Sequence, residues 1–168
     1  TMKVLMIGLD GATWDLIKPW ASQGHLPTFK KLIEEGIHGE LESTIPPWTI
    51  PAWNAISTGK NPGKLGFTHF ASRQNGSYKF KPEFLYTKET DVWNILSDAG
   101  KAVIVVNPPN VHEASMVNGY MVAGFLYLDK EVLTYPKTLK NKLDEAVGGY
   151  EVDVLDADIA SDVEKRYE

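Results

Sequence analysis

Two residues in the first third of the chain carry oxygen atoms in surroundings that suit phosphate chemistry. Asp10 ends the apolar run KVLMIGLD, and Thr49 opens the segment TIPAWNAISTG, which has the pattern of a short helix. A threonine hydroxyl needs strong activation before it can act as a nucleophile, and a metal ion in contact with its oxygen is the usual source of that activation. Thr49 as a nucleophile therefore requires carboxylates nearby, and Asp10 is the first candidate.

We expect Thr49 to be the N-cap of its helix, because a hydroxyl residue here precedes a turn that contains Pro51. Free backbone N–H groups and the positive end of the helix dipole face outward at such a position, where phosphate binds readily. The alternative is a plain cap, which contributes about 1 kcal/mol to stability. Thr44, Ser57 and Thr58 are competing nucleophiles, although Thr44 would end a strand and the other two would lie at the far end of the helix.

Asp10 also has two interpretations. In open parallel sheets, reactive side chains lie just beyond the carboxyl ends of strands. Gly8 and Gly11 flank this stretch and would allow a sharp turn and the close approach of another group. The alternative is that Asp10 caps the helix that follows, as many Asp-Gly turns do.

Segments with strand and helix patterns alternate along the chain. We expect strands at residues 3–10, 38–44, 101–109, 119–126 and 150–155, and helices at residues 13–24, 26–36, 49–59, 88–100 and 136–149. The runs 3–10 and 101–109 are continuously apolar, as in strands buried on both faces. In the helix at 88–100, one apolar face is expected to comprise Val92, Ile95, Leu96 and Ala99. The alternation predicts an α/β fold with an open, mainly parallel sheet and helices on both faces.

The composition is that of an ordinary globular protein. The 168 residues are 43% apolar and 23% charged, with a net charge of −5 and no cysteine. We expect a single α/β domain over residues 1–168. The acidic balance argues against a nucleic-acid polymer as partner, and the absence of cysteine excludes thiolate zinc sites and fits a reducing compartment. The N-terminal apolar run is too short for a signal peptide or membrane helix, so we expect a cytoplasmic protein without a membrane partner.

Five segments together resemble the alkaline phosphatase superfamily: GLDGATWD, LPTFKKLIEEG, PPWTIPAWNAISTGKNPGKLGF, DVWNILSDAGKAVIVVNPP and NGYMVAGFL. Within it, the chain is most similar to the predicted phosphohydrolase or phosphomutase branch, which is related to type I phosphodiesterases and nucleotide pyrophosphatases. The resemblance runs from about residue 3 to residue 139. It implies an alkaline phosphatase-like core, incomplete here, and a metal-dependent phosphohydrolase, phosphomutase or phosphodiesterase that acts on a small phosphorylated substrate.

The resemblance also implies roles for individual residues. Asp10 would bind one of two divalent metal ions, zinc or manganese, and Thr49 would be the phosphorylated nucleophile and contact the metal. Trp48 and Ile50, on either side of Thr49, would line the substrate site. An asparagine that holds a phosphate oxygen in phosphodiesterase relatives has no counterpart, because ungapped counting places Phe70 there. His69, just before it, is the candidate for that contact, with a surface histidine as the alternative.

Other features depart from the superfamily pattern. Leu65 replaces the histidine of the usual P-x-x-H-G block. The superfamily's later ligands are an Asp with a His four positions on, an adjacent Asp-His pair and a final His. None of the histidines here, at positions 25, 38, 69 and 112, follows an Asp at either spacing.

We therefore expect residues 1–168 to be the N-terminal part of a longer catalytic domain, inactive alone, an expectation that the helix-like pattern from Ser161 to the last residue supports. The alternative is a non-catalytic phosphate- or nucleotide-binding module. Transfer of sulfate or phosphonate is a further possibility on the same scaffold. Asn107 and His112 could line a substrate pocket, but we expect both to lie in a solvated loop.

Overall fold

A computed structural model of the chain describes residues 3–66, 71–73, 80–82, 89–124 and 133–152. The contacts between its residues divide the chain into two units, Thr1–Ser43 and Thr44–Glu168. Each unit is described by itself below. The single α/β domain expected over residues 1–168 stays a prediction.

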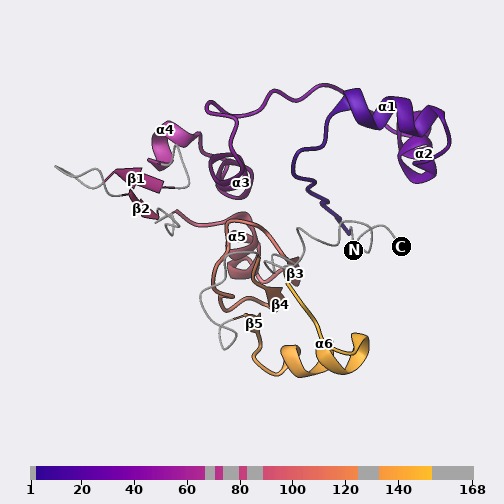
Figure 1. The fold of residues 1–168 in the computed structure, drawn as a ribbon. Helices are drawn as coiled ribbons and strands as arrows, with labels where there is room; N and C mark the ends of the chain where they lie inside the picture. Colours follow the sequence, from indigo (N-terminus) through magenta and orange to yellow (C-terminus); the bar gives the residue numbers. More distant parts are fainter. Residues whose placement is uncertain (1–2, 67–70, 74–79, 83–88, 125–132, 153–168) are drawn as a thin grey trace. The chain divides into compact units, whose positions relative to one another are not determined.

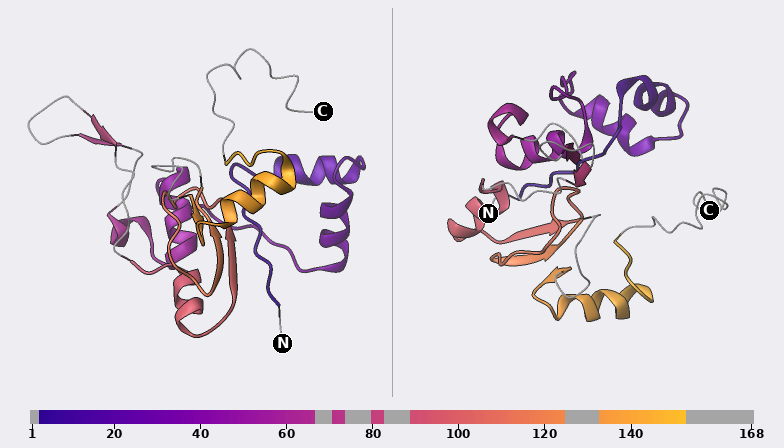
Figure 2. Two further views of the ribbon diagram at one scale, coloured as in Figure 1. Left: turned by 90° about the horizontal axis from the view of Figure 1, so that it is seen from below. Right: turned by 60° about the vertical axis from the view of Figure 1, so that its left-hand side comes forward.

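The first unit contains two short helices that contact each other, α1 (Trp14–Ser22) and α2 (Pro27–Glu35) (Figure 2). The hydroxyl oxygen of Thr13 caps α1 by accepting a hydrogen bond of 3.3 Å from the backbone N–H of Asp15. Pro27 opens α2, where its missing N–H costs nothing. Both helices were predicted from the sequence, and both are confirmed.

The two strands expected in the first unit are not formed. Residues 3–10 and 38–44 have no strand partner among the described parts of the chain. The apolar side chains of the first segment are 64–84% exposed at Val4, Leu5, Met6 and Ile7. A strand is defined by hydrogen bonds to a neighbour, so an apolar pattern without a paired neighbour leaves an exposed, extended segment. The prediction of a strand buried on both faces is therefore wrong here.

The second unit holds the remaining elements (Figure 1). Its helices are α3 (Thr49–Thr58), α4 (Pro62–Leu65), α5 (Val92–Asp98) and α6 (Leu139–Val147). Its strands are β1 (Ala71–Arg73), β2 (Phe80–Pro82), β3 (Val103–Val106), β4 (Gly119–Val122) and β5 (Thr134–Tyr135). The short helix α4 and the antiparallel pair β1–β2 were not predicted. Residues 153–155 of the last expected strand lie outside the described residues, as does the segment from Ser161 onward.

The main sheet has the order β3-β4-β5 and is mixed. Strands β3 and β4 run parallel, with Val103 opposite Gly119, and β4 and β5 run antiparallel, with Met121 opposite Tyr135. The chain thus has the mixed α/β character that was expected. A mainly parallel sheet is not confirmed in the part of the chain that the structure describes.

One face of the sheet carries the core of the second unit. The buried apolar side chains there are Trp93, Val103, Val111, Val117, Met121, Ala123 and Leu133. On β3, Ile104 and Val106 point away from this core and are 75% and 60% exposed. The expectation that β3 is buried on both faces is wrong, because the core covers only the face of β3 that carries Val103 and Val105.

Helix α5 contacts both β3 and α3, but its packing differs from the predicted face. Trp93 is the residue it buries, whereas Val92, Ile95 and Leu96 are 39–55% exposed. Trp93 is the side chain that α5 contributes to the core, and the predicted apolar stripe is turned away from that core. None of the helices in the described ranges has the length and apolar character needed to cross a membrane.

Candidate functional site

Thr49 occupies the first helical position of α3 rather than the N-cap. The N-cap is Trp48, whose backbone is extended (φ −111°, ψ 152°) and whose carbonyl oxygen accepts the N–H of Ala52 at 3.0 Å. Helical hydrogen bonding therefore begins one residue earlier than predicted, and the expectation that Thr49 is the cap is wrong. Thr49 is partly exposed within the first turn.

The first turn of α3 is suited to hold an anion. The N–H groups of Thr49 and Ile50 are among those that a helix leaves without an intrahelical acceptor, and Pro51 has no N–H. Ile50 is only 1% exposed, so its side chain is buried and does not line the surface at this turn. Trp48 is 49% exposed and borders the same turn. The helix dipole adds to the preference for a negatively charged group at this end.

The three competing hydroxyl groups each donate to a backbone carbonyl. Thr44 Oγ1 donates to Pro46 O at 2.9 Å, and Ser57 Oγ and Thr58 Oγ1 donate to Asn54 O at 3.3 and 2.6 Å. In the described part of the chain, Thr49 Oγ1 has no such hydrogen bond. Thr49 is therefore the hydroxyl in this group that is available for chemistry.

Asp10 lies in an exposed turn and does not cap α1. Gly11, next to it, has φ +67°, which supplies the sharp turn that the sequence suggested. Thr13 caps the helix instead, so the capping interpretation of Asp10 is wrong. Asp10 belongs to the first unit and Thr49 to the second. The role of Asp10 as a metal ligand stays a prediction.

Three further residues of the predicted site lie after α3: Leu65, His69 and Phe70. Leu65, which replaces the usual histidine, is the last residue of α4. His69 and Phe70 lie outside the described residues, so the proposed phosphate contact of His69 also stays a prediction.

A buried polar cluster, which the sequence analysis did not identify, joins α3 to the loop after β3. Asn54 and Ser57 on α3 are 3% and 2% exposed. The side-chain amide of Asn110 donates to Ser57 Oγ at 3.0 Å and to Asn54 Oδ1 at 3.3 Å. Asn54 also donates to Ile50 O at 2.9 Å. The sequence does contain a signal for this cluster, namely an asparagine and a serine inside a helix. Such residues lower helix propensity unless their side chains form hydrogen bonds.

Asp91, the N-cap residue of α5, belongs to the same polar cluster. Burial raises the pKa of its carboxyl group above the usual value, and a hydrogen bond with the Ser57 side chain partly offsets this increase. The second carboxylate oxygen, Oδ1, is buried without a hydrogen-bond partner. The charged form of Asp91 therefore makes the folded state less stable than a neutral group of the same shape would.

We expect Asp91→Asn to increase the free energy of unfolding at neutral pH. A raised pKa means that the folded chain binds a proton that the unfolded chain has already lost. Stability therefore falls as the pH rises from about 3.8, the ordinary pKa, through the raised value. Asparagine removes this loss, and no capping hydrogen bond is lost with the carboxylate, since the Asp91 side chain makes none to α5. Urea unfolding of the wild-type and Asp91→Asn proteins should be measured between pH 3 and 8. The difference in their free energy of unfolding should grow with pH across that window, and a constant difference would contradict the prediction. The titratable residues that line the same pocket as Asp91 are His112 and Glu113, and their effect on the free energy of unfolding is common to both proteins.

Two residues of the loop after β3 are not in the solvated loop that we expected. His112 is 3% exposed and therefore buried. Asn107 is partly buried with φ +52°, and its side-chain oxygen accepts a hydrogen bond of 2.8 Å from the Tyr150 hydroxyl. The expectation is wrong because the Pro-Pro segment turns the chain back over the core instead of away from it.

The comparison with protein families identifies the chain. The model of the type I phosphodiesterase / nucleotide pyrophosphatase family matches residues 4–165. The chain belongs to this family. It thereby belongs to the alkaline phosphatase superfamily, and the predicted resemblance is confirmed. No curated protein and no solved structure matches the chain.

Type I phosphodiesterases and nucleotide pyrophosphatases are phosphoric ester hydrolases that are generally metal-dependent and act on small phosphorylated substrates such as nucleotides. The oxygen donors of Asp10 and Thr49 are of the kind that divalent ions bind. In the described part of the chain, however, no group of three or more His, Cys, Asp or Glu residues could hold a metal ion. The assignment of Asp10 and Thr49 as metal ligands therefore stays a prediction.

Proposed function

We propose that residues 1–168 carry the nucleophile of a metal-dependent phosphodiesterase, phosphohydrolase or phosphomutase, with Thr49 as the attacking group. The observation that carries this proposal is the position of Thr49 in the first turn of α3, with a hydroxyl group that donates to no carbonyl among the described residues. The family supports the reaction class. Asp10 is proposed as a metal ligand, as its motif in the superfamily suggests.

In the proposed reaction, a phosphate group binds at the amino end of α3, where the N–H groups of Thr49 and Ile50 donate to its oxygens. Thr49 Oγ1 attacks phosphorus in line with the leaving oxygen, so that a threonine–phosphate bond forms while the bond to the leaving group breaks. The hydroxyl proton passes to a water molecule as the bond forms, and the leaving oxygen takes up a proton from water. Water or an acceptor alcohol then takes the phosphoryl group and restores the threonine. A divalent ion, when bound, supplies positive charge that favours the ionised hydroxyl.

Exposed Trp48 is proposed to border the substrate, and the carboxylate and histidine ligands missing here are proposed to follow in a longer catalytic domain. The proposed metal ions are zinc or manganese, and the proposed location is the cytoplasm. His69 is kept as a proposed phosphate contact.

A second candidate function is a phosphate- or nucleotide-binding module without catalysis. It is favoured by the same helix end, because donors at a helix terminus bind anions without any metal. The two functions differ in whether the protein turns over a phosphoric ester and in whether its activity or binding depends on metal.

We expect the turnover of bis(4-nitrophenyl) phosphate by the complete natural protein to fall by about a hundredfold or more in excess EDTA, since the ion supplies several kcal/mol of charge stabilisation. Added Zn²⁺ or Mn²⁺ should restore the rate. Calorimetric titration with AMP, with and without EDTA, is the companion measurement. Absence of turnover together with AMP binding that EDTA leaves unchanged would overturn the enzyme proposal and support the binding module.

A further inference from the structure

A pocket of about 240 Å³ lies in the second unit, beside the buried polar cluster. Its inner wall includes the buried side chains of Asn54, His112 and Met121, and its outer wall includes the exposed residues Glu113 and Ser115. The pocket therefore leads from the surface into the interior. Both Asn54 and its partner Ser57 lie beyond the first turn of α3, so this pocket is distinct from the proposed phosphate site.

The charge of the pocket favours a cation. The ionisable groups among its described lining residues are Asp91, His112 and Glu113, and none of these lining residues is a lysine or arginine. Two carboxylates in a partly buried site repel phosphate and attract positive charge, more strongly than they would in water.

Two buried oxygens at this site need hydrogen-bond donors. Asp91 Oδ1 and Asn110 Oδ1 have no partner, although both side chains are otherwise engaged with the polar cluster. An unpaired buried acceptor costs about 1–3 kcal/mol, and such groups are rare in folded proteins. Both oxygens are shielded from solvent, so a ligand reaches them only when neighbouring side chains rotate, which is a common change at binding sites.

The chemistry of the lining distinguishes an organic cation from a metal ion. Ca²⁺ takes six to eight oxygen ligands, and no three acidic or histidine side chains among the described residues are grouped so that they could hold a metal ion. An ammonium group carries three N–H donors, which suit a carboxylate and an amide oxygen. The apolar side chains of Val111 and Met121 line the same pocket and can contact an aliphatic body.

We propose that this pocket binds a small aliphatic amine, whose ammonium group donates to Asp91 Oδ1 and Asn110 Oδ1 and whose chain lies against Val111 and Met121. Glu113 contributes attraction at the entrance. The site is independent of the proposed phosphoryl chemistry, so its test requires no enzymatic activity.

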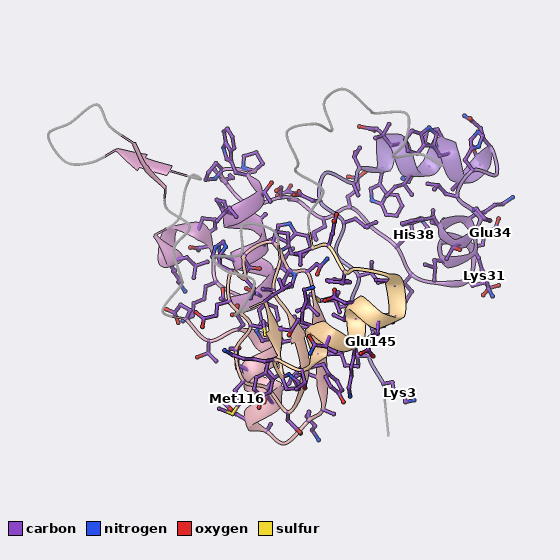
Figure 3. The ribbon with its side chains drawn as sticks, turned by 60° about the horizontal axis from the view of Figure 1, so that its bottom comes forward. Lys3, Lys31, Glu34, His38, Met116 and Glu145 are labelled. Carbon is purple, nitrogen blue, oxygen red and sulfur yellow. The ribbon has the colours of Figure 1, made fainter. Side chains whose placement is uncertain are left out.

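The test is isothermal titration of the complete natural protein with 1,4-diaminobutane at pH 7.5, with 1,4-butanediol as the neutral ligand of matching length. We expect saturable binding of the amine and none of the diol. Asp91→Asn, which is nearly isosteric, should weaken binding at least about tenfold, equivalent to about 1.4 kcal/mol. Glu113→Gln, at an exposed position, should weaken it about threefold. The matched control is Glu145→Gln on α6, labelled in Figure 3, which removes a carboxylate outside the pocket and should change nothing.

Several outcomes would overturn the amine site. Equal binding of the diol would show that charge is not recognised, and unchanged affinity in Asp91→Asn would place the amine elsewhere. A Ca²⁺ affinity higher than that of the amine would assign the pocket to a metal ion instead. An absence of heat with the amine, confirmed by unchanged amide chemical shifts of residues 110–115, would leave the pocket to water alone.

Discussion

Replacing Thr49 with alanine is expected to lower the turnover of the complete natural protein by about a thousandfold or more, as the loss of a covalent nucleophile does in other enzymes. The fold should survive the change. Thr49 is the first residue of α3 and its side chain caps no backbone N–H, so the free energy of unfolding should change by less than about 0.5 kcal/mol. The measurements are steady-state hydrolysis of bis(4-nitrophenyl) phosphate and urea unfolding.

Two controls make this prediction specific. Thr49→Ser keeps a hydroxyl and should retain measurable turnover, and Thr44→Ala removes a competing hydroxyl and should leave the rate within a factor of about three. In a reaction stopped with acid, mass spectrometry should find the phosphorylated peptide at Thr49. Near-normal turnover of Thr49→Ala, or a phosphate on Ser57 or Thr58, would move the nucleophile away from the start of α3.

Replacing Gly124 with alanine is expected to destabilise the second unit by about 3 kcal/mol. A Cβ atom at this position would lie 2.0 Å from Pro108 O and 2.6 Å from Pro108 C. Both atoms are backbone, so no side chain can rotate away, and overpacking of a closely packed interior is costly. Gly124 is also tied by its N–H to Val111 O at 2.8 Å, which prevents it from moving aside.

Gly39→Ala is the matched control, because a Cβ there meets no atom within 4 Å. Denaturant unfolding followed by tryptophan fluorescence should show a lower midpoint for Gly124→Ala only. Gly124→Ala should also weaken the hydrogen bonds of Asn110 with α3, because Gly124 lies against Pro108 in the loop that carries Asn110. Equal midpoints for the two alanine variants would show that the loop moves without cost.

The sequence allowed most of the helices to be predicted and a smaller part of the sheet. Helices begin and end with local signals such as Thr13, Pro27 and the glycines that follow α3 and α6, so their existence could be predicted from neighbours in the sequence. Strands depend on partners that are distant in the sequence. The run at residues 3–10 has as strong an apolar pattern as β3, yet only β3 is paired in the described parts of the chain.

The site shows the same division between local and distant information. The start of α3 and the turn at Asp10 were predicted within a residue or two because both depend on short motifs. Asp91 and Asn110 could not be found, since their roles arise only when residues from three segments meet. The prediction of the buried face of α5 failed for a related reason. Periodicity identifies the apolar face of a helix, but not that Trp93 is the side chain of α5 that enters the core.

The link between Asn110 and α3 has a consequence for the order in which the chain folds. Its hydrogen bonds join residues 56 and 53 positions apart, so they form only after β3 and the following loop are in place. Helix α3 buries Ile50 and Pro51 but supplies no member of the apolar core of the sheet, so we expect it to be fixed late. By the same reasoning, it is released early when the unit opens locally. Amide hydrogens in the helix that carries Thr49 should thus exchange with solvent faster than those of β4, and the proposed chemistry depends on the last part of the unit to become ordered.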